Sequence, residues 1–239
     1  MVPVPARVGQ AGMALGSVLL GLEQKALDLF FPRRCVGCSS DGDWLCAPCQ
    51  ASVKAGPGKR ELAGHPVISL LPFERPEVRE LLHGLKYDGI ADAAGSLADA
   101  SLLCAGSPEG MFGYLDPEGR GIVLVPVPSA AATRRRRGYS QAVLLAEALG
   151  VRLGLPVWPQ ALVRTSAGSQ VGHTAAERKE RASTLFSWGG RKVPAEYGGR
   201  VWVVVDDLLT TGATVDACLG CLEGRGAGGL AGLAVAWER

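Results

Sequence analysis

Residues 201–214 form the stretch VWVVVDDLLTTGAT, an apolar run followed by two adjacent acids and a turn rich in threonine and glycine. The run 201–205 has no polar alternation, which is typical of a strand buried on both faces of a parallel sheet. Adjacent carboxylates repel each other, and burial of an unpaired charge costs several kcal/mol. We therefore expect a positive group, or several hydrogen-bond donors, opposite Asp206 and Asp207.

The turn that follows the two acids has the composition of an anion site. Its glycine allows the backbone to approach a ligand closely, and the helix expected from 214 to about 222 presents free amide groups at its start. The two acids can accept hydrogen bonds from neighbouring hydroxyls, as on a ribose, and lie near a bound Mg2+. The expected phosphate cradle consists of Thr210, Thr211, Gly212, Ala213 and Thr214.

Apolar runs alternate with helical patterns beyond residue 64. Strands are expected at 67–73, 121–128, 201–205 and 230–237, and helices at 140–150, ending at Gly150, and at 214–222. This alternation predicts an α/β fold with a parallel sheet. Residues 55–64, AGPGKRELAG, have the composition of a linker, so we predict a first domain at 1–58 and a second at 59–239.

Composition excludes several classes of protein. Of 239 residues, 47% are hydrophobic and 20% charged, as in soluble globular chains. The net charge of +2 argues against extensive coverage of a polyanion, so any basic patch is local. No apolar run is long enough to predict a membrane span. For the N-terminal 35 residues we favour an amphipathic helix over a signal peptide.

Four of the seven cysteines have metal-ligand spacing: Cys35-x2-Cys38-x7-Cys46-x2-Cys49. Each CxxC pair forms a turn, or knuckle, and two knuckles can direct four thiolates at one Zn2+. A site whose four positions are all filled by cysteines has no open position for a substrate, which predicts a structural role. Unpaired cysteines and a disulfide pair are the weaker alternatives. The pattern favours a reducing compartment, and we expect a cytoplasmic protein.

The remaining cysteines and glycines carry no strong signal. Cys104, Cys218 and Cys221 lie in apolar segments, and we interpret the pair at 218 and 221 as helix packing, since a redox role would need a lowered thiol pKa. A Walker-B reading of the acids fails because the chain has no GxxxxGK[ST]. The GxGxxG at 224–229 follows a helix and precedes a strand, so it predicts a turn.

The opening stretch resembles the signature loop of type I phosphoribosyltransferases, which bind 5-phosphoribosyl-1-diphosphate (PRPP). From about residue 27 to the end, the chain resembles the ComF family, a zinc ribbon followed by a phosphoribosyltransferase-like domain. The resemblance rests on FFPRRCVGC, on LLHGLKYDG with His83, Lys86 and Tyr87, on VPVPSAAATRRRRGYSQA, and on SQVGHTAAERKERASTLF with Gln170, Arg178 and Phe186. Tyr139 and Ser140 depart from the usual Phe-Asn, and Arg181 stands where Asn is common.

The resemblance assigns roles to these residues. Asp206 and Asp207 would hold the ribose 2- and 3-hydroxyls as the catalytic pair, and residues 210–214 would hold the 5-phosphate. The segment 164–177 resembles the mobile loop that covers PRPP. Candidates for the diphosphate and loop contacts are Pro128, Ser129, Arg136, Arg137, Arg164 and Arg178. The alternative for the arginine run 134–137 is a solvated charge run.

Two functions follow from these features. The first is an enzyme that transfers phosphoribose from PRPP, with Mg2+, to a nitrogen nucleophile and releases diphosphate. The second is a non-catalytic adaptor that binds a nucleotide or single-stranded DNA during DNA uptake for natural transformation. In that case the arginine run and Tyr139 would grip the phosphate backbone and stack a base. The expected partners are PRPP or another phosphorylated ribose, single-stranded DNA and DNA-uptake proteins.

Overall fold

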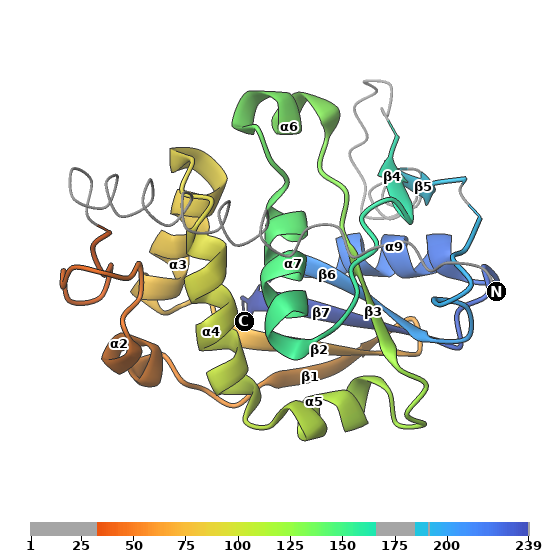
Figure 1. Cartoon of the computed structure of the whole chain (residues 1–239), viewed down its shortest axis with the longest axis horizontal. Helices are drawn as coiled ribbons and strands as arrows, with labels where there is room; N and C mark the ends of the chain where they lie inside the picture. Colours follow the sequence, from red (N-terminus) through yellow and green to blue (C-terminus); the bar gives the residue numbers. More distant parts are fainter. Residues whose placement is uncertain (1–32, 166–184, 191, 239) are drawn as a thin grey trace, which may run out of the picture.

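A five-stranded sheet forms the centre of the molecule (Figure 1). The computed structural model describes residues 33–165, 185–190 and 192–238, so the expected N-terminal helix lies outside the described residues. The strand order is β1 (Gly58–Leu62), β2 (His65–Pro72), β7 (Gly229–Trp237), β6 (Val201–Leu209) and β3 (Ile122–Pro126). β2, β7, β6 and β3 are parallel, and β1 is antiparallel. The predicted α/β fold with a parallel sheet is confirmed.

The sheet is covered on both faces, as the unbroken apolar run of β6 predicts. Val203 and Val205 share a core with α4 (Ala93–Ala105) and α7 (Gln141–Leu153). Trp202 and Val204 pack on the other face with α9 (Ala213–Leu222) and with the hairpin of β4 (Leu162–Arg164) and β5 (Phe186–Trp188). Successive side chains of a strand point to opposite faces, so a strand between two layers needs apolar residues throughout.

Shorter helices surround the sheet and the layers that cover it. They are α2 (Ala47–Ser52), α3 (Pro76–His83), η1 (Gly84–Asp88), α5 (Pro108–Leu115) and α6 (Ala131–Arg137). The turn of π-helix η1 continues directly from α3 and ends at Gly89, whose φ is 73°. Figure 1 shows α6 standing away from the layered body, beyond α7.

The predicted end of the helix at 140–150 and the predicted linker at 55–64 are wrong. α7 continues past Gly150 to Leu153 and ends at Gly154, whose φ is 65°. Gly150 serves close packing instead: a Cβ there would lie 2.8 Å from the Leu155 carbonyl oxygen. The predicted linker contains β1, which forms a hairpin with β2 from Gly58 opposite Ser69 to Leu62 opposite His65. Its pattern of charges resembled a linker because an edge strand exposes one face to solvent.

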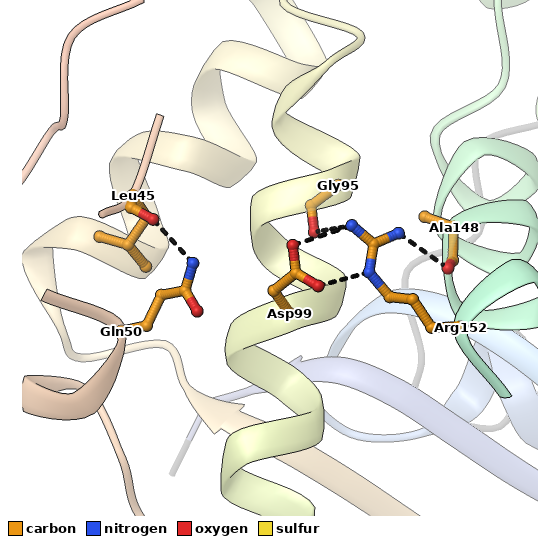
Figure 2. A network of polar contacts seen from close by, with 6 residues as sticks. All are labelled: Leu45, Gln50, Gly95, Asp99, Ala148 and Arg152. Carbon is orange, nitrogen blue, oxygen red and sulfur yellow. Dashed lines mark hydrogen bonds and ion pairs between the residues drawn. The ribbon is translucent and has the colours of Figure 1, made fainter. Parts of the chain in front are cut away.

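A polar network fastens α7 to α4 (Figure 2). The Arg152 guanidinium donates from Nη2 to Oδ2 of Asp99 at 2.8 Å and to the Gly95 carbonyl at 3.1 Å, and from Nη1 to the Ala148 carbonyl at 3.0 Å. The two helices that cover one face of the sheet are therefore held together beside the core.

Within the described ranges, none of the helices combines the length and apolar character that crossing a membrane would require.

Candidate functional site

The two acids lie at the carboxyl end of β6, in the wall of a cavity of about 400 Å³. Ligands bind at this edge in many open α/β sheets, because loops from neighbouring strands converge there. The cavity is lined by residues of η1, of the segment after β3, of α6, of α7, of β4, of the end of β6 and of the start of α9. Its polar and charged lining residues are Lys86, Ser129, Thr133, Arg137, Gln141, Arg164, Asp206, Asp207 and Thr214.

A lysine lies opposite the acids, as their repulsion predicts. Nζ of Lys86 is 2.9 Å from Oδ2 of Asp207, and both side chains are largely buried, with 25% and 16% of their surface exposed. Lys86 belongs to η1, so folding brings it to β6 from a distant part of the sequence. The sequence motif contained Lys86, but nothing in it indicated which acid the ammonium would contact.

The neighbouring acid, Asp206, has a different charge environment. Burial raises the pKa of its carboxyl group to about 7, and the charge of Asp207 adds to this effect. The Asp207 amide donates to Asp206 Oδ1 at 2.9 Å, and together with Lys86 and Arg164 it opposes the rise. One acid of the pair is therefore ion-paired, and the other changes protonation near neutral pH.

The turn after β6 has the geometry of a helix start. Gly212 has a φ of 84°, and a Cβ there would lie 2.6 Å from Cδ1 of Leu62, so both backbone and packing require glycine. α9 begins at the next residue, and its first two residues, Ala213 and Thr214, are exposed. Of the predicted cradle, Thr214 lines the cavity, and the others do not belong to its lining: Thr210, Thr211, Gly212 and Ala213.

The segment after β3 forms the opposite side of the cavity. Pro128, Ser129 and Arg137 line it, whereas Arg136 is exposed and does not. The guanidinium of Arg137 lies 5.2 Å from the ring centroid of Tyr87. Ser129 and Ser140 share a hydrogen bond of 2.8 Å between their hydroxyl groups. The departure at Ser140 thus supports the loop through a side-chain contact.

Arg164 is the third cation in the cavity wall. It ends β4, and its guanidinium lies 5.4 Å from the Phe186 ring centroid. Gln141, at the start of α7, is a lining residue that sequence reasoning did not single out. The predicted contacts Gln170 and Arg178 lie outside the described residues.

The other two members of the HxxKY motif lie outside the cavity lining. Nδ1 of His83 is 3.2 Å from Oδ2 of Asp88, and the His83 ring lies 4.7 Å from that of Tyr87. Both side chains are mostly exposed, with 60% of the His83 side chain and 62% of Tyr87 accessible. Lys86 is therefore the residue of this motif that reaches the acids.

Tyr139, the residue that we expected to stack a base, makes other contacts in the fold. The Tyr139 hydroxyl donates to the Leu85 carbonyl at 2.8 Å, and its ring packs against the core. Tyr87, in contrast, is exposed beside Arg137. The sequence places Tyr139 next to the arginine run, and only the fold brings Tyr87 there.

The four cysteines of the two knuckles converge as predicted. The Sγ atoms of Cys35, Cys38, Cys46 and Cys49 all lie within 4.8 Å of one another, a spacing and donor set that fit a metal ion such as zinc. A Cβ at Gly37 would lie 2.8 Å from Cys49 Sγ, so glycine leaves room for the cluster. A hydrogen bond with Ser40 contributes most to lowering the pKa of Cys38 to about 6, whereas the hydrogen bond with Cys46 contributes most to raising the pKa of Cys49, so the four thiols are not equivalent.

Cys218 and Cys221 pack within the protein. Cys218 is buried in α9, and the thiol of Cys221 donates to the Phe186 carbonyl at 3.3 Å. Burial raises the pKa of both thiols, which is the opposite of what a redox-active pair needs.

Comparison with known proteins gives two curated relatives and no matching family model. The chain is 33% identical over 94 residues to competence protein F of Haemophilus influenzae, and 30% identical over 141 residues to the DNA utilization protein YhgH of Escherichia coli K12. The matches cover 39% and 59% of this chain and 40% and 58% of those proteins, so the chain spans about half of their length. The resemblance to the ComF family is confirmed.

Solved structures of adenine phosphoribosyltransferases are also similar. The enzyme of Saccharomyces cerevisiae matches with 16% identity and a TM-score of 0.38, over 80% of this chain and 89% of that one. A second adenine phosphoribosyltransferase matches with 17% identity and a TM-score of 0.39, over 79% and 88% of the two chains. TM-scores this low add nothing to the fold assignment, which rests on strand order and layers.

Proposed function

We propose that this ComF-type protein binds PRPP, or another phosphorylated ribose, in the cavity at the end of β6. One observation carries the proposal: the acids Asp206 and Asp207 share a cavity of about 400 Å³ with Lys86, Arg137 and Arg164. A ribose that carries phosphate groups offers hydroxyl donors for the acids and anionic oxygens for the cations.

The roles follow from where the groups lie. Asp206 and Asp207 would accept hydrogen bonds from the two ribose hydroxyls, and the start of α9 with Thr214 would hold the 5-phosphate. The guanidinium groups of Arg137 and Arg164 suit a diphosphate, because their planar donors match its oxygens. Mg2+ bound with the diphosphate would neutralise part of its charge and fits the two carboxylates as oxygen ligands.

We further propose phosphoribosyl transfer at this site. A nitrogen nucleophile attacks C1 of PRPP, the bond from C1 to the diphosphate oxygen breaks, and diphosphate leaves with that electron pair. The nucleophile then loses its proton to water. Asp206 and Asp207 would position the ribose and stabilise the positive charge that develops on it, and no side chain has to form a covalent bond.

Calorimetry with Mg·PRPP tests the binding proposal. Wild type should bind one equivalent, and Asp206→Asn/Asp207→Asn should abolish binding. Glu109→Gln/Glu147→Gln is the matched control, because it makes the same change in net charge at two exposed residues that do not line the cavity. Folded wild type that binds no PRPP would contradict the proposal, and diphosphate release in a screen of amine acceptors would establish transfer.

A second function is supported by α6. Arg134, Arg135 and Arg136 are exposed, and none has an ion-pair partner within residues 33–165, 185–190 and 192–238. Such a local basic patch can bind the backbone of single-stranded DNA in a DNA-uptake complex. Arg134→Ala/Arg135→Ala/Arg136→Ala, which leaves Arg137 in the cavity wall, should weaken the salt-dependent affinity for an oligonucleotide and leave PRPP binding intact. Unchanged affinity for the oligonucleotide would contradict this second role.

A further inference from the structure

Two buried donors in the cavity wall have no hydrogen-bond partner within the described residues. They are Nε of Arg137 and Nε2 of Gln141, and the Gln141 side chain is buried, with 5% of the residue exposed. Buried polar groups are almost always hydrogen-bonded, so an orphaned pair on one cavity needs an explanation. A ligand rich in acceptor oxygens would satisfy both donors.

The backbone at Lys86 is held in place by contacts of the residues on either side of it. The Leu85 carbonyl accepts from the Tyr139 hydroxyl at 2.8 Å, and the Tyr87 ring lies under Arg137 at 5.2 Å. The backbone of η1 is thus held against the end of α6, which carries Arg137, and against the segment that leads from there to Gln141. The Lys86 ammonium sits on a flexible stem, so it can turn from the acids toward an anion bound at these donors in the shared cavity.

The ammonium occupies the place beside Asp207 that a free cation would otherwise take. With Nζ at 2.9 Å from Oδ2 of Asp207, a divalent ion has to displace Lys86 before it can use both carboxylates. Displacement is easier when the ammonium gains an anionic partner at the same moment. A ligand that brings both a metal ion and phosphate oxygens meets this condition, whereas the metal ion alone does not.

We propose that Lys86 is an exchangeable cation of this site: it pairs with Asp207 in the free protein and transfers to the diphosphate of the ligand, which also accepts from Gln141 and Arg137. The cavity then binds a divalent ion together with its phosphorylated ribose and excludes the ion alone. This inference rests on the proposed binding of PRPP. It adds Lys86 and Gln141 to the residues that contact the diphosphate, and it requires the divalent ion to bind together with the ligand.

The proposal predicts opposite effects of one substitution on two ligands. Lys86→Gln should tighten the binding of Mn2+ alone by at least about threefold, because the acids lose their internal cation. The same change should weaken Mg·PRPP about tenfold or more, because a charge-assisted hydrogen bond to the diphosphate is lost. Ribose 5-phosphate, which has no diphosphate, should change by less than about twofold.

The experiment measures Mn2+ by paramagnetic resonance and both sugar phosphates by calorimetry. Lys86→Arg should retain most of the PRPP affinity, and Lys54→Gln is the control for charge, since Lys54 is exposed and does not line the cavity. Gln141→Glu is an independent test that keeps the side-chain shape: it should weaken PRPP more than about tenfold by placing a carboxylate against the diphosphate, and should spare ribose 5-phosphate.

Three results would overturn the inference. Weaker binding of Mn2+ and PRPP in parallel for Lys86→Gln would show that Lys86 only supports the acid pair. An equal loss of affinity for PRPP and ribose 5-phosphate in Lys86→Gln would show that Lys86 does not contact the diphosphate. Unchanged PRPP affinity in Gln141→Glu would show that Gln141 does not contact it either. If wild type binds neither sugar phosphate, the proposed function fails, and Mn2+ binding still decides whether Lys86 masks Asp207.

Discussion

At the scale of single residues, Asp206 and Asp207 show how identical neighbours acquire different properties. Asp207 is paired with Lys86, whereas burial and the charge of Asp207 raise the pKa of Asp206 to about 7. The sequence predicted that these acids would need a partner, since adjacent carboxylates repel. It could not identify Lys86 as that partner or rank the two acids, because both depend on contacts made only in the fold.

The raised pKa of Asp206 predicts that this carboxyl group destabilises the fold near neutral pH. The folded state keeps the proton that the unfolded chain, with an ordinary pKa of 3.8, has already lost. This contribution to the free energy of unfolding therefore falls as pH rises from about 4 to about 7 and stays low above that. Asp206→Asn should raise the melting temperature at pH 8 by a few degrees and change it little at pH 4.

Thermal melts of wild type and Asp206→Asn between pH 4 and pH 8 check this prediction. Asn keeps an oxygen that can accept the 2.9 Å hydrogen bond from the Asp207 amide, so the change removes the charge and little else. A variant less stable than wild type at pH 8 would contradict the account. Greater stability combined with lost PRPP binding would show that the protein retains a destabilising acid for function.

At the scale of elements, η1 connects parts of the site that are far apart in the sequence. Lys86 contacts the end of β6, Tyr87 contacts Arg137 at the end of α6, and the Leu85 carbonyl accepts from Tyr139. Turns of π-helix occur often at functional sites. The strands β2, β3, β6 and β7 and the helices α7 and α9 could be predicted from the sequence, because burial of one or both faces dictates their pattern. η1 and β1 could not, since tertiary contacts decide them.

The start of α9 predicts a sharp contrast between two glycines. Gly212→Ala should destabilise the protein by about 1–3 kcal/mol, because Gly212 has a φ of 84° and a Cβ there would lie 2.6 Å from Leu62. Gly220→Ala, within the exposed face of the same helix, should be neutral or stabilise by up to about 1 kcal/mol. Gly220 has no atom within 4 Å of an added Cβ, which makes it the matched control.

Denaturant unfolding of the two variants measures this difference. Equal stabilities for Gly212→Ala and Gly220→Ala would show that the turn after β6 is free to rearrange, and so is no preformed phosphate cradle. The expected loss at Gly212 alone would support a turn whose shape is fixed before a ligand arrives.

At the scale of the whole molecule, the cysteine cluster and the sheet domain share one core. Leu45 and Val53, which flank the second knuckle, are buried in the same cluster as Leu97 of α4. Cys104, also in α4, receives a hydrogen bond from the Ala55 amide at 3.3 Å. The cluster was predicted correctly from its spacing, whereas this packing was not, because contacts between distant segments leave no pattern in a single sequence.

We therefore expect a metal bound at the cysteine cluster to stabilise the entire chain. Purified protein should contain about one zinc per chain, and Cys38→Ser should lose the metal and several kcal/mol of stability. Cys221→Ser is the matched control, since its hydroxyl can still donate to the Phe186 carbonyl. Metal analysis together with thermal melts checks both variants, and a metal-free wild type of full stability would contradict this role.

A crystal structure of the complex with Mg·PRPP is the measurement that tests the central claim most directly. The account predicts the ribose hydroxyls at Asp206 and Asp207, the 5-phosphate at the start of α9, and the diphosphate beside Arg137, with Lys86 turned away from Asp207. A ligand bound at the exposed arginines of α6, with the acids still paired to Lys86 and no sugar beside them, would contradict it.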